Sequence, residues 1–138
     1  MARPASPAEI ASYFRGAAKD VQAVVASASS ARIAWRGKEP VFIGLFVRFA
    51  VNVVYHATST ERVEDRLWLH FETRERGRDV ALAVVRTAHA MTKGVTEPVY
   101  ALCDERKFET APRLLRMCGF APVNDEIWGQ EKIWQKLP

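Results

Sequence analysis

The segment LHFETRERGRDVALAVV, residues 69–85, changes from the hydrophobic period of a strand to that of a helix. Before Thr73 the apolar and polar side chains alternate, which is typical of a strand. From Val80 to Lys93 the apolar side chains recur at helical spacing, and Gly94 ends the pattern. One face of the strand carries Leu67, Leu69 and Phe71, and the opposite face carries Trp68, His70 and Glu72. One side of the helix carries the apolar residues Ala81, Val84, Val85, Ala88 and Met91, and the other side carries Asp79, Arg86 and Lys93.

The turn between this strand and this helix is rich in arginine and has a glycine near its end. A glycine turn that opens a helix points several backbone N–H groups at one spot, where the helix dipole favours an anion such as a diphosphate. Arg74, Arg76 and Arg78 add charge and hydrogen-bond donors around Gly77. A solvated basic turn with a glycine for its geometry explains the same residues, so both interpretations stay open.

The residues before this segment predict two helices followed by an antiparallel meander. Ser6, Pro7 and Glu9 are typical of a helix start with a capping box, and Gly16 is expected to split the helical stretch in two. Strands are predicted at Ala31 to Trp35 and at Ile43 to Tyr55, the second of them bent or bulged once. A polar loop, Thr58 to Glu64, is then expected to lead into the third strand of the meander.

The residues after the helix predict a buried strand, a short helix and a closing hairpin. The strand is Pro98 to Cys103, and the helix begins at Thr110 and ends at Gly119. Phe120 to Val123 and Glu131 to Trp134 then form the hairpin. The expected fold is therefore a single α/β (α+β) domain, residues 1–138, with a mixed and mostly antiparallel sheet flanked by helices.

Composition excludes several classes of protein. A chain of 138 residues with 49% hydrophobic and 26% charged residues is typical of one soluble globular domain. No apolar run is long enough for a transmembrane helix, no secretory signal is visible, and we expect a cytoplasmic protein. Two cysteines and three histidines form no disulfide framework and no zinc spacing, so no metal is expected.

The net charge of +4 comes from the first 60 residues, which hold seven Lys/Arg against three Asp/Glu. The basic residues are scattered and not interleaved with aromatic ones on one face, so neither a nucleic-acid nor a membrane partner is predicted. An anionic small molecule remains compatible with the sequence.

The motif RERGRD, residues 74–79, resembles the Arg/Gln-x-x-Gly-x-Gly/Ala signature of the GNAT family of N-acetyltransferases, with Arg74 and Gly77 matching and Asp79 at the sixth position. The segment PVYALCDERKFETAPRLLRMCGFAPV, residues 98–123, is similar to the family's next strand, helix and Gly-Phe ending. RPASPAEI and ARIAWRGKEPVFIGLFV resemble its first strand, first helix and first hairpin, so the likeness covers nearly the whole chain. The resemblance implies a GNAT-like fold and acetyl-CoA as cosubstrate. It also implies that acetyl-CoA contacts Phe71, Arg74, Arg76, Gly77, Arg78, Asp79 and Leu115. Leu115 stands where many members of the family have a tyrosine.

By the same resemblance, a carboxylate near the start of the third meander strand, Glu64, is a candidate for the base that deprotonates the acceptor amine, and His70 and Glu72 are alternatives. A solvent-facing polar edge also explains each of these three residues and is the simpler interpretation for each. The first functional hypothesis is acetyl-CoA-dependent N-acetyl transfer to an unidentified amine of a small molecule or a protein. The second is a non-catalytic GNAT-like structural or protein-binding protein of a phage or prophage, similar to internal virion proteins and then located in the virion. A homodimer or a larger assembly is compatible with either hypothesis.

Overall fold

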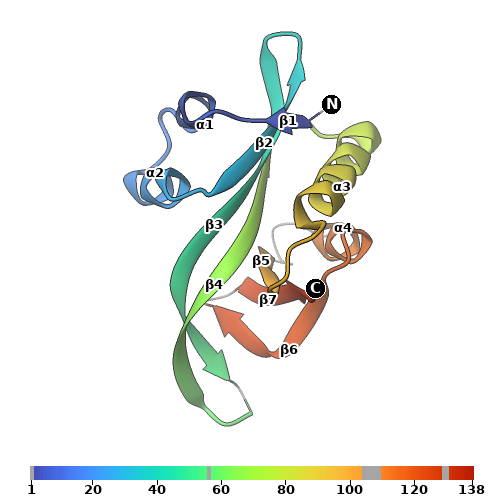
Figure 1. Cartoon of the computed structure of the whole chain (residues 1–138). Coiled ribbons are helices and arrows are strands. Elements are labelled where there is room, and N and C mark those ends of the chain that lie inside the picture. Colours follow the sequence, from blue (N-terminus) through green and yellow to red (C-terminus); the bar gives the residue numbers. More distant parts are fainter. Residues whose placement is uncertain (1, 56, 104–109, 129–130) are drawn as a thin grey trace.

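Seven strands form one sheet in the order β1-β2-β3-β4-β5-β7-β6, with helices on both faces (Figure 1). The computed structural model describes residues 2–55, 57–103, 110–128 and 131–138. The elements are β1 (Ala2–Pro4), α1 (Pro7–Tyr13), α2 (Lys19–Ala26), β2 (Ser30–Arg36), β3 (Glu39–Tyr55), β4 (Thr60–Thr73), α3 (Arg78–Thr92), β5 (Val99–Cys103), α4 (Ala111–Met117), β6 (Ala121–Trp128) and β7 (Glu131–Lys136). All neighbouring strands pair antiparallel except β4 and β5, so the predicted mixed, mostly antiparallel sheet is confirmed.

The first helix begins at the predicted capping box, and the helical stretch divides around Gly16 as predicted. The Ser6 hydroxyl accepts a hydrogen bond from the Glu9 N–H at 3.2 Å, and the Ser6 N–H donates to the Glu9 carboxylate at 3.0 Å. This capping box satisfies two N–H groups that a helix start leaves without partners. Gly16 adopts a φ of 84° between α1 and α2, a conformation that favours glycine, so the predicted split is confirmed.

The hairpin of β3 and β4 is longer than the sequence suggested. Most of the predicted loop, Thr58 to Glu64, is strand, because β4 begins at Thr60 and pairs with Tyr55. The loop prediction was wrong because residues 60–63 are exposed and mostly polar although they pair with β3 as a strand. There polar side chains meet solvent while the ladder still pairs the backbone groups.

The ladder between β3 and β4 is unbroken from Phe42 to Tyr55, so β3 contains no bulge against β4. The strand is bent instead, as Figure 1 shows. The pairing of β2 with β3 does shift once. Ala34 pairs with Phe42 but Trp35 pairs with Pro40, so the irregularity on β3 lies before Ile43, where the predicted strand begins.

Two layers of helices cover the two faces of the sheet (Figure 1). The α1 and α2 face buries one apolar cluster, which includes Tyr13, Leu45 and Trp68. The α3 and α4 face buries two more, and on α3 the buried stripe contains Val80 and Thr87, whereas the predicted Ala81 is only half-buried. Within the described ranges, none of the helices is long and apolar enough to cross a membrane.

The C-terminal strands close the sheet on itself. As predicted, β6 and β7 form a hairpin, but β7 lies between β5 and β6, and β6 also pairs with the far edge of β3 through Val54 and Tyr55. The pairings β3–β4, β4–β5, β5–β7, β7–β6 and β6–β3 therefore form a closed circuit. The β3–β6 pairing gives partners to backbone groups at the ends of these two strands, which would otherwise lie on open edges.

The parallel strands β4 and β5 pair at only two positions, Leu67 with Val99 and Trp68 with Tyr100. Beyond them no register pairing joins residues 69–73 to residues 101–103. The two strands therefore separate toward the end of β4, where the arginine turn and α3 follow.

Gly44 makes room for a ring beneath α3. A Cβ added at Gly44 would lie 2.6 Å from Phe71 Cε1 and 3.1 Å from Met91 Sδ. We predict that Gly44→Val lowers the free energy of unfolding by about 1–3 kcal/mol, the usual cost of overpacking. Urea unfolding checks this, and the double variant Gly44→Val/Phe71→Ala should lose less than the sum of the single losses. Additive losses would contradict the contact.

Candidate functional site

The arginine turn ends at Gly77, which is the N-cap of α3. Gly77 has φ 138° and ψ 165°, a conformation that residues with a side chain rarely adopt. The Ala81 N–H donates to the Gly77 carbonyl at 3.0 Å, so the backbone N–H groups of Arg78, Asp79 and Val80 begin the helix without intrahelical partners. The predicted glycine turn at a helix N-terminus is confirmed.

The side chains nearest this helix start include the predicted Asp79, together with Glu75 and Arg36, which the sequence did not indicate. Arg36, at the end of β2, contacts Glu75 at 3.1 Å and Asp79 at 3.8 Å. A Cβ at Gly77 would lie 3.0 Å from Asp79 Oδ1, so this carboxylate lies back over the turn. All three charged side chains are exposed, so water and salt screen these pairs and they contribute little to stability.

The three arginines of the turn have different surroundings. The Arg74 guanidinium lies over the Tyr13 ring, with its carbon 4.1 Å from the ring centroid, and donates to the Tyr13 carbonyl. Arg76 and Arg78 are exposed, and within the described ranges neither has a hydrogen-bond or ion-pair partner. Only these two of the three arginines are therefore uncommitted.

Phe71 and Leu115, the two apolar residues predicted to contact the cosubstrate, belong to one apolar layer between the sheet and the helices α3 and α4. Both side chains are half-buried. Phe71 also packs against Phe42, with ring centroids 6.1 Å apart. The layer borders the separated ends of β4 and β5.

The three candidate bases occupy alternate positions on one face of β4, but not one site. Glu64 and His70 are six residues apart, which corresponds to about 20 Å along a strand. His70 and Glu72 lie in the part of β4 that has left β5, whereas Glu64 lies on the outer hairpin. The structure therefore groups His70 with Glu72 and separates both from Glu64.

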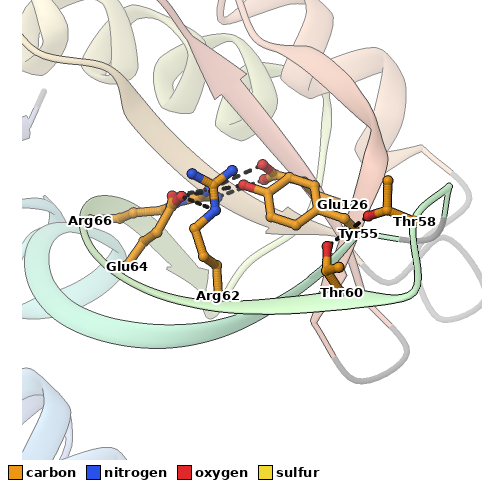
Figure 2. Close-up of polar contacts among 7 residues, drawn as sticks. All are labelled: Tyr55, Thr58, Thr60, Arg62, Glu64, Arg66 and Glu126. Atoms are coloured by element: carbon orange, nitrogen blue, oxygen red, sulfur yellow. Dashed lines mark hydrogen bonds and ion pairs between the residues drawn. The ribbon is translucent and has the colours of Figure 1, made fainter.

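Glu64 is held in a network of ion pairs and hydrogen bonds (Figure 2). One carboxylate oxygen accepts hydrogen bonds from Arg66, and the other is 3.4 Å from Arg62 Nε and accepts from the Tyr55 hydroxyl at 3.3 Å. The Arg66 guanidinium holds the pKa of Glu64 below its usual value, with Tyr55 and Arg62 adding to the effect. Glu64 is thus a poor proton acceptor.

Arg66 is the centre of this network and was not predicted from the sequence. Its side chain is 4% exposed, and it donates to both carboxylate oxygens of Glu126 on β6, at 2.7 and 3.1 Å. Its guanidinium carbon also lies 4.1 Å from the centroid of the Tyr100 ring. Burial alone would lower the pKa of Arg66, but the hydrogen bonds to Glu126 and Glu64 outweigh burial and raise it. The network ties β6 to β4.

His70 has different electrostatics. The surrounding protein lowers the pKa of its imidazole by desolvation, and the nearby Glu72 opposes this only in part. Because its pKa is lowered, the imidazole is neutral near pH 7. The ring is also exposed, so it can accept a proton from a molecule that reaches it. Glu72 is exposed, and its backbone carbonyl accepts a hydrogen bond from the Tyr13 hydroxyl at 3.0 Å. Of the three candidates, His70 is best suited to act as a base.

The two cysteines belong to the apolar cluster on the α3 and α4 face. Cys103 and Cys118 are buried thiols, and burial raises the pKa of Cys118 to about 11. Among the described residues, no three His, Cys, Asp or Glu side chains are grouped to hold a metal ion.

No protein-family model and no curated protein matches the chain. Among solved structures, the crystal structure of smu.2055 from Streptococcus mutans UA159 is similar, with a TM-score of 0.59 and 13% sequence identity. The match covers 98% of this chain and 97% of that chain. At this identity the likeness concerns the fold alone.

Proposed function

We propose that this protein is a GNAT-like N-acyltransferase that uses acetyl-CoA and transfers its acetyl group to an amine. The observation that carries the proposal is the place where β4 leaves β5. The separated strand ends, the Gly77 turn at the start of α3 and the apolar layer under α3 and α4 follow one another there. This order brings the N–H and arginine donors of the turn beside an apolar layer, which suits a diphosphate with a pantetheine arm.

The residues of the turn fit the diphosphate in part. The free N–H groups after Gly77 and the uncommitted side chains of Arg76 and Arg78 are suitable donors. Arg36 is a further donor once it leaves Glu75 and Asp79. Phe71 and Leu115 would border the apolar arm.

Acetyl-CoA supplies an activated thioester, and the protein has to orient it and remove a proton from the attacking ammonium. In the proposed reaction the amine nitrogen bonds to the acetyl carbon, the carbon–sulfur bond breaks, and the proton goes to His70 directly or through water. Leu115 has no hydroxyl to protonate the departing thiolate, so that proton comes from solvent. The acceptor amine is a small molecule or a protein side chain.

A second candidate, a non-catalytic protein of the same fold, is favoured by one specific observation. Glu75 and Asp79 place two carboxylates where the diphosphate would lie. A carboxylate about 4 Å from a phosphate costs roughly 1–4 kcal/mol, depending on solvent exposure. Asp79 is 70% exposed, so the lower end of this range applies.

Titration calorimetry with CoA and acetyl-CoA distinguishes the two candidates. We predict that the wild type binds and that Asp79→Gly binds about fivefold more tightly, since about 1 kcal/mol of repulsion is removed. Asp79→Asn separates charge from crowding, and Asp65→Asn on the exposed part of β4 serves as the matched control. Binding only by Asp79→Gly would favour the non-catalytic candidate. Absence of binding by every variant at millimolar CoA would refute the acyltransferase.

A further inference from the structure

Three contacts join the last residue of α1 to the end of β4. The Arg74 guanidinium lies over the Tyr13 ring and donates to the Tyr13 carbonyl, and the Tyr13 hydroxyl donates to the Glu72 carbonyl at 3.0 Å. Tyr13 is 4% exposed and packs against Phe14, with ring centroids 5.1 Å apart. The aromatic end of α1 is therefore fixed to β4 from both sides.

The chemistry of these contacts suits an arginine in particular. The Tyr13 carbonyl belongs to the last turn of α1, where carbonyls have no helical partners and the helix dipole favours a cation. A guanidinium can donate to such a carbonyl and stack on a ring at once, which an ammonium does less well. Among the described residues, Arg74 has no carboxylate partner. Its side chain is already committed without any ligand.

His70 lies on the sheet face that this end of α1 covers. In the ladder, Leu45 is directly opposite His70. Leu45 belongs to the same apolar cluster as Tyr13 and Phe14. The Tyr13 hydroxyl bonds to the carbonyl of Glu72, two residues along the same strand, so the end of α1 lies over the face of β4 that carries His70.

We propose that Arg74 is a positioning residue, which fixes the end of α1 beside His70 and so shapes the wall that the acceptor amine meets. This inference rests on the proposed function for its catalytic meaning. The inference leaves the Gly77 turn, with Arg76 and Arg78, to bind the diphosphate. Arg74 is then no longer one of the predicted contacts of acetyl-CoA.

The test compares Arg74→Gln and Arg74→Lys with the wild type, with circular dichroism to verify folding. We expect both variants to exchange the amide hydrogens of residues 10–17 at least tenfold faster. We also expect the pKa of His70, followed by NMR, to rise toward its ordinary value, because desolvation now lowers it. CoA affinity should stay within about twofold in both variants. Tyr13→Phe, which keeps the ring under Arg74, should give a smaller change in exchange.

A ligand role for Arg74 gives a different pattern. In that case Arg74→Gln would lose tenfold or more in CoA affinity, Arg74→Lys would retain most of it, and α1 would exchange as in the wild type. That pattern would overturn the inference. Unchanged exchange together with an unchanged His70 titration would also overturn it, whether or not CoA binds. Absence of CoA binding by the wild type would instead refute the proposed function, while the exchange and the His70 titration still decide whether Arg74 positions α1.

Discussion

Replacing Arg66 with methionine should lower the free energy of unfolding by about 3–5 kcal/mol, the usual cost of removing one partner from a buried ion pair. Arg66 is 4% exposed, and its bidentate partner Glu126 is 7% exposed. Methionine fills much of the volume but removes the guanidinium that donates to the buried Glu126, whereas Glu64 keeps only its contacts with Tyr55 and Arg62. Chemical unfolding at pH 7 measures the loss.

Arg62→Met is the matched control, because Arg62 lies on the same strand and contacts Glu64 but is 64% exposed. It should cost less than about 1 kcal/mol. The triple change Glu64→Gln/Arg66→Met/Glu126→Leu should recover most of the lost stability, because no buried charge is then left alone. A loss below 1 kcal/mol for Arg66→Met would show that the network contributes little.

The same network predicts a dependence on pH. Arg66 lowers the pKa of Glu64 in the folded chain, so the stability from this carboxylate is present above its unfolded pKa. It is lost as the pH falls through the lower folded pKa. Arg66→Met should therefore remove this contribution to acid sensitivity, whatever its effect at pH 7.

Features fixed by neighbouring residues were predictable from the sequence. The capping box of Ser6 and Glu9, the break at Gly16 and the turn at Gly77 each depend on residues within a few positions of one another. The change of hydrophobic period around residues 69–85 likewise locates β4 and α3. The first residues of β4 were missed because their exposed and mostly polar side chains show no hydrophobic alternation.

Contacts between distant residues account for most of what the sequence did not reveal. Arg36 meets Glu75 across 39 positions, Arg66 meets Glu126 across 60, and Arg74 meets Tyr13 across 61. The second of these depends on the pairing of β6 with β3, which no local pattern predicts. As a result, the sequence located the candidate turn and base but not which of their charged groups were already committed.

The largest effect on ligand binding is expected from Gly77→Val. The φ of 138° at Gly77 is accessible to glycine but not to a β-branched residue, and a new Cβ would lie 3.0 Å from Asp79 Oδ1. The turn must therefore rearrange, and the N–H groups that begin α3 no longer point at one spot. We predict at least a tenfold loss of CoA affinity in titration calorimetry, with a nearly unchanged circular dichroism spectrum.

Gly94→Val is the control for the backbone strain that valine causes at a glycine with positive φ. Gly94 has a φ of 79°, follows the other end of α3, and a Cβ there would meet nothing within 4 Å. This variant should lose stability because of its backbone conformation, yet it should keep its CoA affinity, because the donors at the N-terminus of α3 are untouched. If Gly77→Val retained the wild-type affinity, the diphosphate would have to bind away from this turn. The separated ends of β4 and β5 would then need another explanation.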